Sequence, residues 1–161
     1  MAAPSPSPRR RGPRRGDVTE RAILETAERL LSAKPLSEIG IEELARGAGI
    51  SRPSFYFYFE SREAVLRALA EGVTEALHRA AEPWLEPGDD PPAQAVRRAI
   101  SENLALWREH GPVLRAIRRA RETDPEIRKL LDDFARRYVA ACAEHIERER
   151  AAGRAPAGPP A

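Results

Sequence analysis

Apolar residues recur at helical spacing along most of this chain, and that period limits the possible fold more than any other feature. In the stretch DVTERAILETAERLLSAK, residues 17–34, one helical face carries Ile23, Leu24, Ala27, Leu30 and Leu31. Pro35 ends this helix, because the residue before a proline is driven away from helical backbone angles. The pattern predicts an all-α protein.

Two short helices are predicted next. The first lies in GIEELARGAG, residues 40–49, with Gly40 at the N-cap and Gly49 just past the C-terminal end. The second lies in SRPSFYFYFE, residues 51–60, where Ser51 is a good N-cap and Pro53 is tolerated in the first turn.

The remainder of the chain also reads as helical. A long helix should run from Ser61 towards Trp84, followed by a loop rich in Pro, Gly and Asp at residues 83–92. Three further helices are predicted at about residues 93–109, 112–121 and 125–151.

Five aromatic residues stand in a row at positions 55–59, and they allow two interpretations. A strand would suit their local propensity, but the chain has no second alternating run with which it could pair. In a helix, Phe55 and Phe59 point the same way, with Tyr58 beside them. We therefore expect a helix in which Phe55 and Phe59 are buried, whereas Tyr56 and Phe57 face outward.

Two short helices joined through Gly49 and Ile50 describe a helix-turn-helix. A small core of Leu44, Ala48, Ile50, Phe55 and Tyr58 can hold the second helix at a fixed angle. The outward side near the start of that helix is the part that such a motif places against base edges in the major groove. It carries Arg52, Pro53, Ser54, Tyr56 and Phe57.

These outward side chains suit distinct DNA contacts. Arg52 can donate two hydrogen bonds to guanine, and the ring of Tyr56 can contact a thymine methyl group. Ser54, Tyr58 and Arg62 suit phosphate oxygens, which position a protein without reading sequence.

The run ILETAERLL…IEELARGAGISRPSFYFYFESREAVL resembles the DNA-binding domain of the TetR family of bacterial transcriptional regulators, most closely the EthR-like branch. The resemblance covers about residues 17–77 and implies DNA contacts at Gly40, Arg52, Pro53, Ser54, Tyr56, Phe57, Tyr58 and Arg62. It further implies a homodimeric repressor that binds a palindromic operator on double-stranded DNA and is released by a small hydrophobic effector.

Three features depart from the family pattern. Gly40 stands where the family often has Ser or Thr, so a hydroxyl contact to phosphate is lost there. Glu42 places an acid near the expected DNA surface. The family usually has two more helices, which form the dimer interface, after the equivalent of residues 125–151.

A helical regulatory domain, shortened by those two helices, is expected at residues 78–151. Candidates for lining an effector pocket there are Trp84, Leu104, Trp107, Ile117, Phe134 and Tyr138, with Ile100 and Val113 beside them. Apolar stripes of this kind are more often plain core. An alternative function is an interaction module that pairs with a full-length relative.

Charge and composition complete the predictions. Residues 1–16 hold five arginines and no acid, so we expect a disordered basic arm, and residues 152–161 read as a disordered tail. One cysteine and no apolar span indicate a cytoplasmic protein that does not enter the membrane. Cys142 and His145 lie three residues apart but have no further metal ligand nearby. With no catalytic constellation in the sequence, we expect no enzyme, metal or cofactor.

Overall fold

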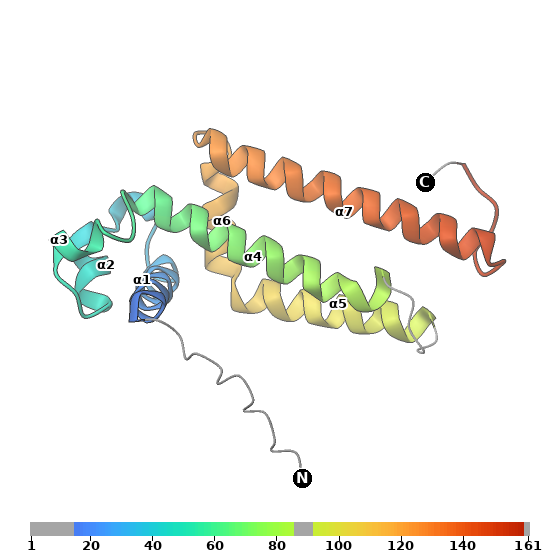
Figure 1. Cartoon of the computed structure of the whole chain (residues 1–161), viewed down its shortest axis with the longest axis horizontal. Coiled ribbons are helices and arrows are strands. Elements are labelled where there is room, and N and C mark those ends of the chain that lie inside the picture. The colour runs from blue at the N-terminus through green and yellow to red at the C-terminus, as the bar shows by residue number, and fades with distance from the viewer. Residues whose placement is uncertain (1–14, 86–91, 160–161) are drawn as a thin grey trace, which may run out of the picture.

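The computed structural model describes residues 15–85 and 92–159, and within these ranges its regular structure is entirely helical, as predicted (Figure 1). None of the described helices is long and apolar enough to cross a lipid bilayer. The elements are α1 (Arg15–Leu31), a short 3-10 helix η1 (Leu36–Glu38), α2 (Ile41–Gly47), α3 (Arg52–Phe55), α4 (Arg62–Leu85), α5 (Pro92–Glu109), α6 (Gly111–Ala120) and α7 (Pro125–Ala151).

Helix α4 connects the two halves of the molecule. In Figure 1 the N-terminal end of α4 lies beside α1–α3, α6 crosses α4, and α5 runs alongside it; α7 also packs against α4. The side chains that it buries form a nearly continuous face, namely Val65, Leu66, Leu69, Ala70, Val73, Leu77, Ala80, Ala81 and Leu85. The boundary proposed between residues 77 and 78 therefore falls inside one unbroken helix.

The crossing of α1 and α2 depends on small side chains. Ala45 of α2 is buried, as is Thr26 of α1. A Cβ atom built on Gly47 would lie 2.3 Å from Cγ2 of Thr26, closer than any real contact. The absence of a side chain at Gly47 thus lets the two helices approach, a role that no local pattern around this glycine indicates.

Two polar contacts join the N-terminal helices and α4 to the helices that follow. Nδ1 of His110, just before α6, lies 2.9 Å from Oε1 of Glu28 on α1. Asp124 caps α7 by accepting the backbone N–H groups of residues 126 and 127, and its other oxygen lies 3.1 Å from Nη1 of Arg67 on α4. Each contact ties one end of a C-terminal helix to the N-terminal half.

Several predicted boundaries were wrong. Helix α1 begins at Arg15 instead of residue 17; residues 1–14 of the expected basic arm lie outside the described residues. Helix α4 continues through Pro83 to Leu85, which the sequence assigned to a loop, and α5 already begins at Pro92. Burial of Leu85, whose carbonyl also accepts a hydrogen bond from Arg148 of α7, outweighs the cost of a proline in the last turn.

After α7 the chain loses helical structure. Gly153 has a φ of 70°, the left-handed conformation that commonly ends a helix. Arg150 then donates hydrogen bonds to the backbone carbonyls of Pro156 and Pro159, so that residues 152–159 fold back beside the end of α7.

We predict that Gly47→Ala destabilises the protein. Overpacking against Thr26 should cost about 1–3 kcal/mol, only partly offset by the gain of up to about 1 kcal/mol from removing a glycine. Urea denaturation of both proteins measures the difference. Gly72→Ala is the matched control, because a Cβ there meets nothing within 4 Å and should stabilise α4. Equal effects of the two substitutions would refute the close crossing.

A second prediction concerns Asp124. Burial raises the pKa of its carboxyl group, but the hydrogen bonds from Ile127 N–H, Arg67 and Glu126 N–H outweigh burial and set the pKa below its ordinary value of 3.8. Because the folded pKa is depressed, the stabilisation is complete above the unfolded pKa and is lost as pH falls through the folded value.

Asp124→Ala should therefore cost about 1–2 kcal/mol near neutral pH. Asp124→Asn keeps the cap and should cost less, since it loses only the attraction of Arg67. Denaturant unfolding across the pH range would show the difference between wild type and Asp124→Asn shrinking as pH falls below 3.8. A difference that stays constant with pH would contradict the assigned charge interaction.

Candidate nucleic-acid interface

Helices α2 and α3 are joined by the tight turn that a helix-turn-helix needs. Gly49 adopts a φ of 71°, which a residue with a side chain rarely tolerates, and Ile50 N–H then donates to the carbonyl of Ala45 at 3.0 Å. Ser51 caps α3, its Oγ accepting the N–H of Ser54 at 3.3 Å. The turn and the cap both match the sequence prediction.

The aromatic cluster divides as predicted. Phe55 is 0% exposed and Phe59 is 8% exposed, with ring centroids 6.1 Å apart. Tyr56 and Phe57, in contrast, are 46% and 87% exposed. Burying the first pair anchors α3 on the core, and this anchoring leaves the second pair on the surface.

Helix α3 is shorter than the predicted segment 51–60. Regular α-helix ends at Phe55, after which Phe57 and Tyr58 donate backbone hydrogen bonds to the carbonyls three residues earlier. Such bonds are typical of a tighter helical turn. Phe59 N–H still bonds to the carbonyl of Phe55 at 3.0 Å, so the two buried rings keep their helical spacing.

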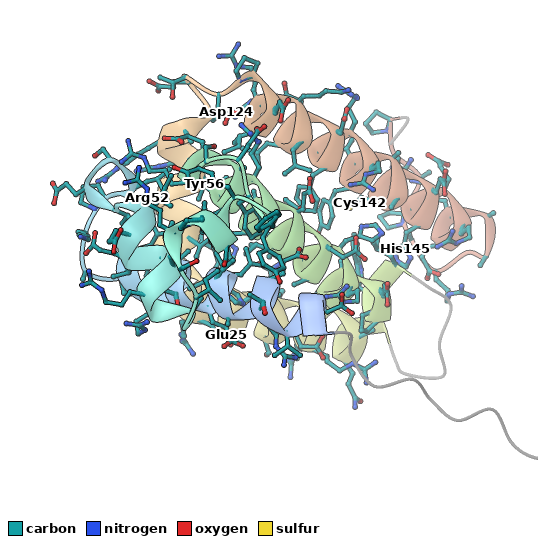
Figure 2. All side chains as sticks on the ribbon, turned by 60° about the vertical axis from the view of Figure 1, so that its left-hand side comes forward. Glu25, Arg52, Tyr56, Asp124, Cys142 and His145 are labelled. Carbon is teal, nitrogen blue, oxygen red and sulfur yellow. The ribbon has the colours of Figure 1, made fainter. Side chains whose placement is uncertain are left out.

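Arg52 and Tyr56 lie next to each other on the exposed side of α3 (Figure 2). Interaction with Tyr56 raises the pKa of the Arg52 guanidinium, and Glu42 adds a smaller effect in the same direction. The acid at Glu42, unexpected near DNA, is itself 3.7 Å from Nη2 of Arg46. A cation therefore accompanies the acid on this surface.

Other predicted DNA contacts are partly engaged within the protein. The Gly40 N–H donates to Oε2 of Glu43 at 3.0 Å, and Lys34 binds the same carboxylate at 2.7 Å. Hydrogen bonds from Lys34 and then from Gly40 hold the pKa of Glu43 below its ordinary value. Ser54 Oγ lies 2.8 Å from Ser51 Oγ.

Arg62 has a structural role that the sequence did not reveal. Its Nη1 donates to the carbonyls of Ser37 and Ile39 at 2.9 and 3.1 Å, and its Nε donates to Glu63. These bonds fix the start of α4 against the η1–α2 connection. The Nη2 group of Arg62 takes no part in these hydrogen bonds. Tyr58 is half-buried and packs on the core, while Pro53 is exposed at the start of α3.

A cavity of about 390 Å³ lies among α4, α5 and α7. Three predicted ligand residues line it, namely Trp84, Leu104 and Tyr138, together with Ile100. Burial raises the pKa of the Tyr138 hydroxyl, with Cys142 adding to the effect. The phenol of Tyr138 is therefore uncharged near neutral pH, and most of the residues around it in the lining are apolar.

The other predicted ligand residues lie elsewhere. Ile117 is 3% exposed and Val113 is also buried, both within the core around α6. Trp107 is 54% exposed and does not line the cavity. Phe134 stacks on Tyr138 with ring centroids 5.9 Å apart but does not itself line the cavity. Helical periodicity placed these apolar residues on a common face of their helices, but it could not show which other helix packs against that face.

His145 and Cys142 lie on α7, away from α3 (Figure 2). The His145 ring lies 4.8 Å from that of Trp84, and burial raises the pKa of the Cys142 thiol. Across residues 15–85 and 92–159, no three His, Cys, Asp or Glu side chains gather closely enough to hold a metal ion.

Two segments of the chain match known families. Residues 23–69 match the bacterial regulatory proteins of the tetR family, and residues 96–161 match the C-terminal domain of the transcriptional regulator EthR. Over 147 residues, the chain is 42% identical to EthR of Mycobacterium tuberculosis, an alignment covering 91% of this chain and 68% of EthR. The chain belongs to the TetR family.

Two further relatives support membership of this family. EthR of Mycolicibacterium smegmatis is 38% identical over 94% of this chain and 70% of its own length. The structure of LfrR from Mycobacterium smegmatis in complex with proflavine has a TM-score of 0.56 and 28% identity, covering 81% of this chain and 71% of LfrR. This TetR-family chain is thus a DNA-binding transcriptional regulator and not an enzyme, as the sequence predicted.

The division of the aromatic cluster predicts opposite outcomes for two substitutions. Phe57→Ala should change the free energy of unfolding by less than about 0.5 kcal/mol but weaken binding to a selected DNA fragment roughly fivefold or more. Phe59→Ala should cost about 3–5 kcal/mol of stability, because it empties a core position. Denaturant unfolding and fluorescence anisotropy measure the two effects. Unchanged DNA affinity in Phe57→Ala would remove this residue from the interface.

Proposed function

We propose that this TetR-family regulator is a homodimeric repressor that reads a palindromic operator and is released by a small hydrophobic effector. The observation that carries the DNA-reading surface is the exposure of Tyr56 and Phe57, directly after the end of α3 and beside Arg52, while Phe55 anchors the helix in the core. Exposed aromatic side chains next to a cation suit a groove that offers both apolar and hydrogen-bonding edges. We expect the protein to work in the cytoplasm, with its DNA.

Individual roles follow from position. Arg52 is proposed to contact a guanine, and Tyr56 and Phe57 to contact bases or sugars. Pro53, Ser54, Tyr58, Gly40 and the free donors of Arg62 are proposed to lie along phosphates. A dimer of such motifs binds half-sites separated by about 34–36 Å, one helical turn of DNA, or by a multiple of that distance.

The effector is proposed to occupy the cavity lined by Trp84, Leu104 and Tyr138. Its volume of about 390 Å³ lies within the usual range of small-molecule sites. The relative LfrR has been solved in complex with proflavine, which supports the proposal that this chain also binds a small molecule. Because the cavity adjoins α4, a ligand bound there can shift this helix, whose N-terminal end packs against the DNA-binding half.

An interaction module that pairs with a full-length relative is the second candidate. It is favoured by the apolar side chains that α5 and α7 expose, namely Ile100, Leu104, Trp107 and Val139. Under this reading the exposed face would bind the relative and thereby block its operator binding.

Equilibrium sedimentation, with and without a pool of genomic DNA fragments, tests the proposal. A dimer that enriches a palindromic fragment supports the repressor. A monomer whose DNA binding is sensitive to salt and blind to sequence would contradict it and favour the interaction module.

On the enriched fragment, Arg52→Ala should lose about 1–3 kcal/mol of binding free energy and relax specificity at one base pair in each half-site. The loss follows from removal of the proposed guanine contact. Arg79→Ala is a matched control, since Arg79 is an exposed arginine on the part of α4 that follows the interface. Competition with single-base variants of the fragment measures both effects. Binding equal to that of Arg79→Ala would exclude Arg52 from base reading.

A further inference from the structure

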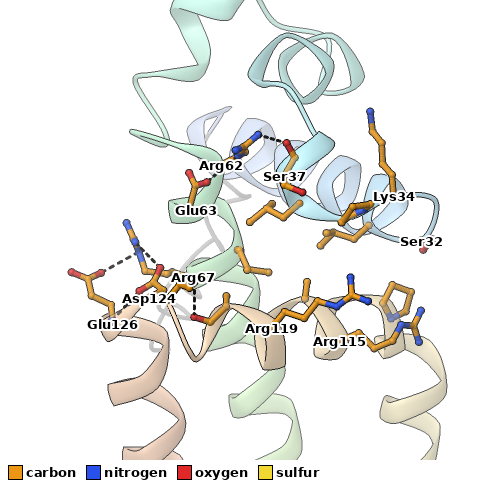
Figure 3. A pocket seen from close by; sticks show the side chains of 18 of the residues that line it. Ser32, Lys34, Ser37, Arg62, Glu63, Arg67, Arg115, Arg119, Asp124 and Glu126 are labelled. Atoms are coloured by element: carbon orange, nitrogen blue, oxygen red, sulfur yellow. Dashed lines mark hydrogen bonds and ion pairs between the residues drawn. The ribbon is translucent and has the colours of Figure 1, made fainter.

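A second, larger cavity lies between the helix-turn-helix half and the helices that follow (Figure 3). It measures about 810 Å³, is open to solvent on one side, and is lined by the end of α1, the connection to η1, the start of α4, α6 and the start of α7. This cavity could not be predicted from local sequence patterns, because its walls come from segments far apart in the chain.

Most charged groups that line this cavity are already paired. Arg67 lies 2.9–3.1 Å from Glu60, Asp124 and Glu126. Arg62 binds Glu63 at 2.9 Å, and Lys34 binds Glu43 at 2.7 Å. The carboxylates in the lining, Glu63, Asp124 and Glu126, are all held by these cations.

Arg115 and Arg119 differ from the rest. Both line the cavity from α6, one helical turn apart, and neither is joined to a partner within the described part of the chain. Like charges at this spacing repel each other. Figure 3 shows both side chains beside the segment from Ser32 to Ser37. An oxyanion between them would relieve the repulsion and accept hydrogen bonds from both guanidinium groups.

The remainder of the lining is largely apolar. Leu31 and Leu36 come from the N-terminal side, Leu66 from α4, and Pro112 and Ala116 from α6. An anion small enough to contact only the arginines would leave these walls empty. A chain of methylene groups attached to the anion would gain free energy by covering them.

We propose that the cavity binds an anionic amphiphile, a carboxylate or phosphate on an apolar chain, with Arg115 and Arg119 holding the head group. The site is separate from the apolar cavity at Trp84 proposed for the effector. A ligand in this cavity would contact both α6 and the α1–η1 connection. Its binding would therefore be coupled to the position of the DNA-binding helices. Only this coupling rests on the proposed function; binding itself does not.

Isothermal titration calorimetry of the full chain with decanoate, below its micelle concentration, tests the site. We expect saturable binding that decanol, which lacks the charge, and acetate, which lacks the chain, do not reproduce. The variant Arg115→Gln/Arg119→Gln should bind decanoate at least about tenfold more weakly. Arg118→Gln is the matched control, since Arg118 is an exposed arginine on the same helix that does not line the cavity.

Decyl phosphate in the same titration distinguishes the two head groups, and tighter binding of either one assigns the head group. Ala99→Phe, which narrows the Trp84 cavity, should leave decanoate binding unchanged. Three outcomes would overturn the proposal. They are equal decanoate binding by the wild type and the double variant, loss of decanoate binding only in Ala99→Phe, and no binding of either amphiphile. All titrations are made without DNA, so their failure leaves the operator-binding proposal intact. Circular dichroism verifies that each variant is folded.

Discussion

Helix α4 buries one face along nearly its whole length, and the other helices pack around that face. Residues from Val65 to Leu85 on this face contact α1, α5, α6 and α7, so a single helix supplies core to both halves of the molecule. Hydrophobic burial supplies most of the favourable free energy in such a fold. The two halves are therefore not independent units joined by a linker. A shift of α4 would change the packing of both halves.

The polar contacts around this helix determine how the halves meet. Arg62 binds backbone carbonyls next to α2, and Arg67 binds the residue that caps α7. On the opposite side, Glu28 of α1 meets His110 at the start of α6. Arg62 and Arg67 also line the larger cavity, the one that contains Arg115 and Arg119. A ligand in that cavity would therefore act where the helix-turn-helix half is attached to the later helices. The apolar cavity at Trp84, in contrast, bears on the later part of α4.

Most of the helix-turn-helix could be predicted from sequence because its signals are local. A glycine at the turn, a serine cap and the pairing of Phe55 with Phe59 each follow from backbone geometry within a few residues. The same reasoning failed at Pro83, where burial of Leu85 extends α4 past a residue that usually ends a helix. It also overlooked Gly47, whose importance comes from Thr26 on another helix.

Periodicity and capping act over one or two helical turns, so the all-helical class, the helix-turn-helix and the separation of buried from exposed aromatics could be predicted from the sequence. Which apolar residues line a cavity and which lie in the core depends instead on how distant helices pack against one another. Ile117 and Leu104 both fit helical stripes, yet one is buried in the centre and the other lines the Trp84 cavity. The unpaired state of Arg115 and Arg119 was likewise decided by tertiary packing, because a side chain's partners depend on which distant segments fold against it.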